Sequence, residues 1–409
     1  MMFWKNILQI FRDMRHQKLR TALTLFGIVW GSVAIILLLT FGEGLYKISS
    51  KAMHGMGESI CIVWPGRTSI HFEGLPRGRF IPFQETDAEL LRQQIPEIRH
   101  ISLEYSREVK VRVGKESYTA SLSAVYPEYQ YMRNMIAVPG GRFINELDQT
   151  TRRRVVFIGD GVEKDLFGVG NGLGKYIEIN STPFLVVGVL KKKIQNSSYN
   201  SFDSNQIFIP STTYLGIFGN RYINNMILQA TKVEYIEQMK AKMYQVMGRK
   251  HRFDPKDKEA LAIWDTSEMD KFTDTFFNGF LIFLAIVGSM TLIVGGIGVS
   301  NIMHVVVEER THEIGIKKAL GAKNKVILGQ FLMETIFIVA VGGLLGFIIS
   351  YGMVAAVNLL NLKEYVGTLS VSPVVWVFTV LTLGMIGLVS GWFPARRAAR
   401  LDPVAAIRK

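Results

Sequence analysis

The sequence predicts a membrane protein with four transmembrane helices and an α+β extracytoplasmic domain of two subdomains. Four long apolar runs lack charged residues, and a polar stretch separates the first run from the second. Lys and Arg are concentrated in three of the segments that flank these runs. With 48% hydrophobic and 20% charged residues, the 409-residue chain is too apolar for one soluble domain and too polar for membrane spans alone.

The four apolar runs are each long enough to cross a bilayer. Charge is absent from 21–42, 275–303, 335–362 and 365–395, and a spanning helix needs about 20 such residues. We therefore predict spans at 22–45, 274–305, 327–358 and 373–395, the last beginning at Ser372-Pro373 because proline favours the first turn of a helix. A cleaved signal peptide is a poorer interpretation of the first run, which is too long and has no small-residue cleavage site after it.

The orientation follows from Lys and Arg in the short flanking segments. Residues 1–21, 306–326 and 396–409 are rich in Lys and Arg, whereas the loop 359–372 has one Lys and one Glu. Because basic flanks stay in the cytoplasm, both termini are predicted to be cytoplasmic, and residues 46–273 and 359–372 extracytoplasmic. Residues 1–21 also place apolar side chains on one face, which predicts an amphipathic helix along the inner leaflet.

The polar stretch 46–273 has the texture of a soluble α+β domain. Residues 175–179 and 184–190 alternate like half-buried strands, and Thr86-Asp87 is expected to cap a helix over 88–95. Residues 46–270 carry 30 Lys and Arg against 25 Asp and Glu, a difference of +5 out of the chain's +13. This balance indicates a solvated surface and no nucleic-acid groove. The single cysteine, Cys61, cannot form an internal disulfide and is expected to be a small buried residue.

No catalytic, cofactor-binding or metal-binding constellation is found in the sequence. The glycine-rich run 168–175 has Val169 where a phosphate loop needs glycine, and Tyr176 where it needs Ser or Thr, which favours a turn. The histidines of the polar stretch lack metal-ligand spacing. We therefore expect no catalytic residue, no cofactor and no metal, and no enzymatic activity of the chain by itself.

Small residues recur four apart within all four spans, at positions where helix backbones can approach closely, either inside one bundle or across a dimer. These pairs are Gly27 and Gly31, Gly296 and Ser300, Gly342 and Gly346, and Gly387 and Gly391. One carboxylate, Glu334, lies near the cytoplasmic end of the third span, where it can reach the interface, pair with Lys325 or serve a function.

The segment between the second and third spans predicts a short cytoplasmic helix over 308–320. Acidic residues begin it, lysines end it, and Gly321 suits a left-handed cap, while Gly315 in its middle costs about 1 kcal/mol of helix propensity. A capped helix with a bare backbone position is expected to dock into a partner. The residues assigned to this docking are Glu308, Glu309, Arg310, Glu313, Gly315, Lys317, Lys318 and Gly321.

Several motifs carry a resemblance to a known family. They are EERTHEIGIKKALGAK, IVGGIGVSNIM and GWFPARRAARLDPVAAIRK in and beside the spans, and RRVVFIGDGVEKDLFG, GKYIEINSTPFLVVGVL and IFIPSTTY in the polar stretch. In this order, over essentially the whole chain, the sequence resembles the permease module of macrolide-exporter-type ABC transporters (MacB and the FtsX-like permeases).

The resemblance implies a mechanism. Such permeases lie in the bacterial inner membrane as dimers, bind an ATPase through the helix after the second span, and act on substrate outside that membrane. Here 308–320 would be the coupling helix, and a β-rich subdomain would be inserted near 106–205. The sequence departs from the best-known members of the family in having no fused ATPase domain, so ATP is expected to be bound by a separate subunit. The expected partners are that ATPase, a second permease chain, membrane lipid, and a periplasmic adaptor with an outer-membrane duct.

The function implied is efflux of a hydrophobic or amphipathic substrate. Lipoprotein release, or regulation of a cell-wall hydrolase in the manner of some FtsX-like proteins, remains the alternative.

Overall fold

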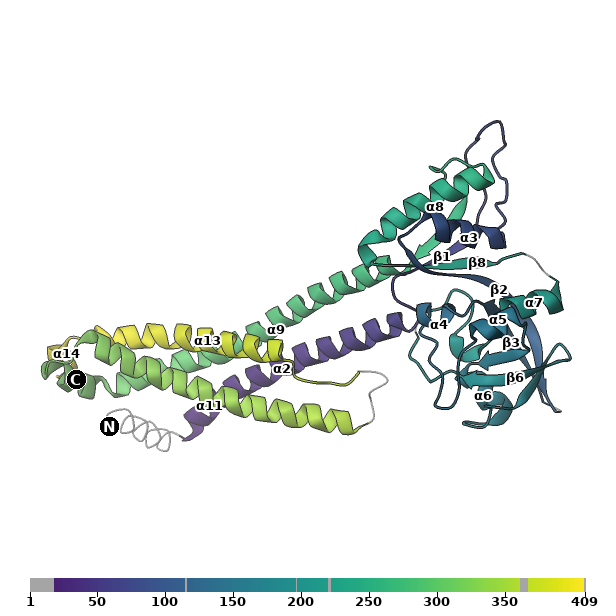
Figure 1. Ribbon diagram of the computed structural model, residues 1–409. Helices are drawn as coiled ribbons and strands as arrows, with labels where there is room; N and C mark the ends of the chain where they lie inside the picture. The colour runs from purple at the N-terminus through teal and green to yellow at the C-terminus, as the bar shows by residue number, and fades with distance from the viewer. Residues whose placement is uncertain (1–17, 115, 196, 220–221, 361–366, 408–409) are drawn as a thin grey trace. The chain divides into compact units, whose positions relative to one another are not determined.

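The computed structural model describes residues 18–114, 116–195, 197–219, 222–360 and 367–407 (Figure 1). They form two compact units. One, the membrane unit, comprises the chain up to Ile48 and from Asp274 onward; the other, the α+β unit, comprises Ser49–Thr273. The predicted amphipathic helix lies outside the described residues, apart from residues 18–21, which belong to the first long helix.

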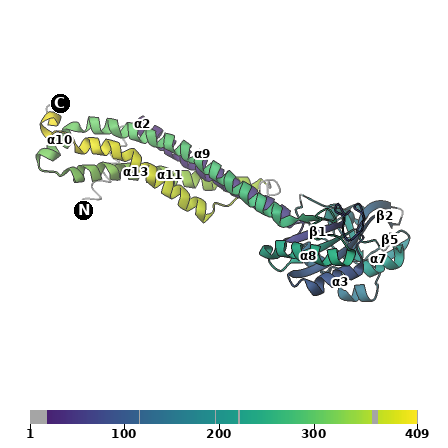
Figure 2. The ribbon, with the colours of Figure 1, turned by 90° about the horizontal axis from the view of Figure 1, so that it is seen from above.

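Within the described part of the chain, four helices are long and apolar enough to span a membrane, as predicted. They are α2 (Lys18–His54), α9 (Thr266–Glu309), α11 (Asn324–Leu359) and α13 (Pro373–Ala399). The start of α13 follows the prediction, because the Ser372 side chain accepts a hydrogen bond from the Val375 amide and proline occupies the first turn. Within the membrane unit α11 and α13 run side by side (Figure 2). Two short helices, α10 (Thr311–Ala319) and α14 (Pro403–Ile407), complete this unit.

The α+β unit is built on nine strands in the order β3-β7-β4-β6-β5-β2-β8-β1-β9, with a further pairing of β3 with β2. The strands are β1 (Ile60–Pro65), β2 (Ile98–Val113), β3 (Glu116–Val125), β4 (Val155–Ile158), β5 (Tyr176–Ile179), β6 (Thr182–Val189), β7 (Gln206–Pro210), β8 (Asn225–Ala230) and β9 (Leu261–Asp265).

The long strand β2 divides this unit into two parts. Residues 98–104 pair with β8 in an antiparallel sheet that continues through β1 to β9. Residues 105–113 pair with β3 on one side and, at 111–112, with β5 on the other, so β2-β3-β7-β4-β6-β5 closes on itself as a six-stranded barrel. The barrel strands run from Tyr105 to Pro210, and the resemblance implies an inserted β-rich subdomain near 106–205.

The helices of this unit are α3 (Glu85–Gln94), α4 (Tyr129–Met132), α5 (Glu146–Thr150), α6 (Asp160–Phe167), α7 (Ser211–Phe218) and α8 (Ile236–His251). The prediction that Thr86-Asp87 caps α3 is wrong. Gln84 is the N-cap and Asp87 is the third helical residue, whose carboxylate accepts from the Gln84 amide at 2.7 Å. An acid at this position completes a capping box from inside the helix.

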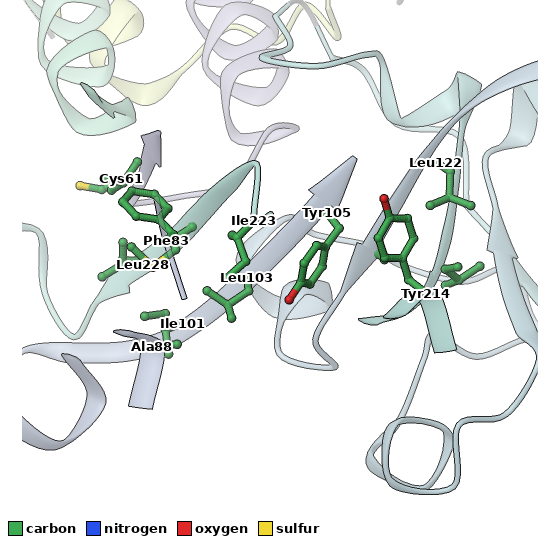
Figure 3. Packing of buried hydrophobic residues seen from close by; sticks show 14 of the residues in the cluster. Cys61, Phe83, Ala88, Ile101, Leu103, Tyr105, Leu122, Tyr214, Ile223 and Leu228 are labelled. Carbon is green, nitrogen blue, oxygen red and sulfur yellow. The ribbon is translucent and has the colours of Figure 1, made fainter. Parts of the chain in front are cut away.

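One apolar core continues through both parts of the α+β unit. Figure 3 shows Cys61, Phe83 and Leu228 beside Ile101 and Leu103, with the Tyr105 and Tyr214 rings nearer Leu122. Cys61 is fully buried, as expected, and burial raises the pKa of its thiol, which keeps it protonated and unreactive. The glycine-rich run is a turn between α6 and β5, with positive φ at Gly168, Gly170 and Gly174.

Candidate functional site

The predicted coupling segment is divided between two helices. Glu308 and Glu309 are the last residues of α9, Arg310 interrupts the helix with φ −95° and ψ 13°, and α10 starts at Thr311. The prediction of one helix over 308–320 was therefore wrong at its start. Met303 and Val307 are buried on the apolar face of α9. Because this face continues as far as Val307, α9 extends past the predicted start of the coupling helix.

The prediction that Gly315 presents open backbone to a partner was also wrong. Gly315 is buried against α14: a Cβ at this position would lie 2.8 Å from Ala406 Cβ and 3.2 Å from Ile407 Cγ1. Both distances are shorter than ordinary carbon–carbon contacts. Gly315 thus lets α10 and the chain's own C-terminal helix pack together. No residue near Gly315 in the sequence indicates this contact.

Basic side chains fasten α10 to its neighbours. Lys318 Nζ donates to the carbonyl oxygens of Ala399, at 3.0 Å, and Leu401, and Lys317 Nζ donates to Gln330 Oε1 of α11 at 3.2 Å. Gly321 has φ +94°, and the amides of 321 and 322 bond back to the carbonyls of 318 and 317, which is a Schellman ending. We call residues 311–321 and 403–407 the α10–α14 platform.

The platform leaves one face of α10 exposed. His312, Glu313, Ile316 and Leu320 are exposed at helical spacing, on the side away from Ile314 and Gly315. Leu320 is 83% exposed, and Val404 on α14 is 77% exposed. Large apolar side chains with so much exposed area beside charged groups are typical of interaction sites.

Glu334 pairs with Arg310, so the suggested pairing with Lys325 was wrong. Arg310 Nη1 lies 3.1 Å from Glu334 Oε1, and the two side chains are 16% and 9% exposed. Nine helical residues place Lys325 about 13 Å along α11 from Glu334, whereas the break before α10 brings Arg310 close. A second ion pair, Arg397 with Glu308 at 3.4 Å, is exposed and contributes little.

The small-residue pairs lie at contacts within the chain. A Cβ on Gly27 would lie 3.3 Å from the Gly295 Cα, and one on Gly31 would lie 2.9 Å from the Leu292 Cα, so these two glycines pack α2 on α9. The remaining pairs also face other helices of the same unit: Gly296 meets Ile386 and Ser390, Gly342 meets Ile28, Gly346 meets Ser32, Gly387 meets Val339 and Gly391 meets Thr335. Ser300 is half-buried, and its carbonyl contacts His304 Nδ1 at 2.9 Å. The seven glycines thus contact other helices of the same unit, whereas the Ser300 contact lies within α9.

The α+β unit contains a buried charged cluster that no pattern in the sequence predicts. Arg133 Nη2 lies 2.7 Å from Asp203 Oδ1, and Lys193 Nζ lies 2.7 Å from Asp203 Oδ2; Arg133 and Asp203 are 1% and 0% exposed. Burial lowers the pKa of Lys193 despite the neighbouring carboxylate. For Arg133 burial acts to lower the pKa, but the Asp203 carboxylate together with Tyr129 and Tyr199 outweighs it, and the pKa is raised. The cluster joins α4 to the segment before β7.

Among the described residues, one group of acids has metal-ligand geometry: Glu237, Asp265 and Glu268. Lys240 Nζ already lies 2.6 Å, 3.0 Å and 3.3 Å from these three carboxylates and forms an ion pair with each of them. The group is therefore an ion-pair network between α8 and the start of α9.

Comparison with known proteins covers both units. Residues 21–246 match a family described as the MacB-like periplasmic core domain, and residues 285–403 match the FtsX-like permease C-terminal family. The chain is 32% identical over 399 residues to a macrolide export ATP-binding/permease protein of Wolinella succinogenes, covering 97% of this chain and 59% of that protein. It is 33% identical over 401 residues to a pyoverdine export ATP-binding/permease protein of Pseudomonas aeruginosa, covering 97% and 57%.

The chain thus spans about three-fifths of the length of these curated relatives. Among solved structures, the periplasmic region of a MacB protein from Actinobacillus actinomycetemcomitans is 21% identical, with a TM-score of 0.42, over 56% of this chain and 98% of that one.

Proposed function

This chain belongs to the MacB-like, FtsX-like permease family, and we propose that it is the membrane subunit of an ABC transporter driven by an ABC ATPase subunit. The proposal includes the cytoplasmic location of both termini, which the Lys and Arg asymmetry supports. The α10–α14 platform would then face the ATPase in the cytoplasm.

The observation that carries the proposal is the construction of the platform. Its exposed face presents Ile316 and Leu320, while the opposite face is fixed by the Gly315–Ala406 contact and by the Lys318 hydrogen bonds. A docking surface transmits force only if it is held firmly to the elements that must move. Here Arg310 and Glu334 tie the junction before α10 to α11, and α9 continues without interruption from Glu309 back to Thr266.

Movement of the platform would therefore pass along α9 into the α+β unit, whose strand β9 ends one residue before α9 begins. We propose that ATP binding and hydrolysis change the α+β unit in this way, and that the change drives export of a hydrophobic or amphipathic substrate, with a periplasmic adaptor and an outer-membrane duct. The two relatives named above are export proteins for macrolides and pyoverdine, which supports export over lipoprotein release or regulation of a cell-wall hydrolase.

The test is co-purification of the full chain with its cognate ATPase subunit. Leu320→Asp places a charge on the exposed face without disturbing a buried contact, so it should abolish co-purification and stimulation of ATP hydrolysis. Leu359→Asp is the matched control, because Leu359 is 84% exposed at the far end of α11. Normal co-purification of Leu320→Asp would refute docking at this platform.

A further inference from the structure

A groove in the membrane unit lies between α11 and α13. It encloses about 300 Å³ and is lined almost wholly by apolar atoms. Ala340, Gly343 and Leu344 of α11 face Val380 and Gly384 of α13, and Ile36 of α2 contributes to the lining. Close packing of the two helices forms the floor, because a Cβ on Gly343 would lie 2.8 Å from Leu383 Cδ1.

A second, more polar cavity of about 560 Å³ adjoins the groove. Phe347 and Trp376 line both, and their rings meet edge to face at 5.2 Å. The second cavity is lined by the polar side chains of Tyr351, Asn358 and Ser372. Tryptophan at such a boundary is typical of the depth at which lipid headgroups begin. An apolar channel with a polar mouth has the two-part chemistry of an amphiphile.

Charge is also present at the mouth. Lys47 Nζ donates to Ser370 Oγ at 3.3 Å, and Ser370 lines the polar cavity. Lys47 is exposed, and a lysine next to a membrane surface attracts anionic headgroups. The neighbouring Ser372 is held in place, since its hydroxyl donates to Glu43 Oε1 at 2.6 Å and also caps α13.

We propose that this groove binds a bilayer phospholipid, with one acyl chain along α11 and α13 and the phosphate in the polar mouth near Lys47. A transmembrane helix from a second copy would present apolar side chains to a mouth that holds the Lys47 ammonium, the Glu43 carboxylate and polar side chains. A phospholipid satisfies both parts, because its chain covers the apolar lining and its phosphate meets the ammonium group.

The structure supplies a substitution that fills the groove. No atom outside its own helix lies within 4 Å of a Cβ built on Gly384, so Gly384→Leu adds bulk to the groove without a clash. Gly279 on α9 is equally open and does not line the groove, so Gly279→Leu is the matched control. Lys47→Gln removes the cation alone.

The experiment uses the purified full chain in nanodiscs, without ATP or an ATPase subunit, so that its failure is independent of the proposed coupling. A phosphatidylglycerol with a photoreactive acyl chain is crosslinked, and labelled peptides are mapped. We expect labelling on α11 and α13, reduced about tenfold by Gly384→Leu because roughly two methylene groups lose their place. Lys47→Gln should remove the preference for phosphatidylglycerol over phosphatidylethanolamine.

Size-exclusion profiles of all variants must match that of the unchanged protein, which separates lost binding from lost folding. Equal labelling of Gly384→Leu and Gly279→Leu, or labels spread evenly over all four long helices, would overturn the proposal.

Discussion

The buried Arg133–Asp203–Lys193 cluster gives a sharp prediction about the stability of the α+β unit. Asp203→Asn preserves size but removes the negative charge that pairs with the buried Arg133 and with the largely buried Lys193. Removing one partner of a buried ion pair lowers the free energy of unfolding by about 3–5 kcal/mol, because the remaining charge is left without a counterion. Since about 1.4 kcal/mol is a factor of ten, the ratio of folded to unfolded protein should fall roughly 100-fold to 4,000-fold.

The assay is pulse proteolysis of the full chain across a urea gradient, which measures the free energy of unfolding of the α+β unit. Glu128→Gln is the control: it removes the Arg92–Glu128 pair, which is of the same kind but 48% and 30% exposed, and should cost less than about 1 kcal/mol. If Asp203→Asn is no more destabilising than Glu128→Gln, the reasoning from burial is refuted.

Three further outcomes follow from other contacts. Burial alone would raise the pKa of Asp87, but hydrogen bonds from His251, Lys250 and the Gln84 amide outweigh it and lower that pKa. The stabilisation from Asp87 is therefore complete above the usual Asp pKa of about 3.9, and it is lost as the pH falls through the folded-state pKa. In urea unfolding, the stability of Asp87→Asn should therefore depend less on acid pH than that of the unchanged protein. An unchanged acid dependence would exclude Asp87 as its source. Gly27→Leu should lower the melting temperature in detergent, because α2 and α9 touch there, whereas Gly279→Leu should not; equal melting temperatures would refute this packing. Asp257→Ala should expose residues 69–70 to protease, because its carboxylate accepts hydrogen bonds from their amides at 2.7 Å and 3.0 Å; unchanged cleavage would refute that role.

The membrane helices could be predicted because the signal is local. A charge-free run and a Ser-Pro start define a span without knowledge of any distant residue, and α13 begins where the sequence places it. The α+β character of residues 46–273 followed in the same way from alternation and helical spacing. No local pattern showed that strand β2 belongs to both the open sheet and the barrel. Its pairing with β8 and with β3 depends on residues elsewhere in the chain.

The site was predicted only in outline. Gly315 stood out because glycine is unfavourable inside a helix. The residue that requires glycine there is Ala406, 91 positions along the chain, and local sequence patterns do not reveal a contact at that separation. Glu334 stood out as a membrane carboxylate, yet its partner Arg310 is brought near by the break between α9 and α10. The burial of Arg133 depends on tertiary packing, and nothing in its neighbours along the chain indicates it.

The central claim is that ATP hydrolysis by an ATPase subunit docked on the α10–α14 platform alters the α+β unit. Its most direct test is hydrogen–deuterium exchange of residues 49–273 in the reconstituted complex of the full chain with its ATPase subunit, with and without ATP. Exchange should change on adding ATP in the unchanged complex and in Leu359→Asp, and should stay constant in Leu320→Asp. The claim is contradicted if ATP leaves the exchange of residues 49–273 unchanged in the unaltered complex, or alters it equally when Leu320 is replaced.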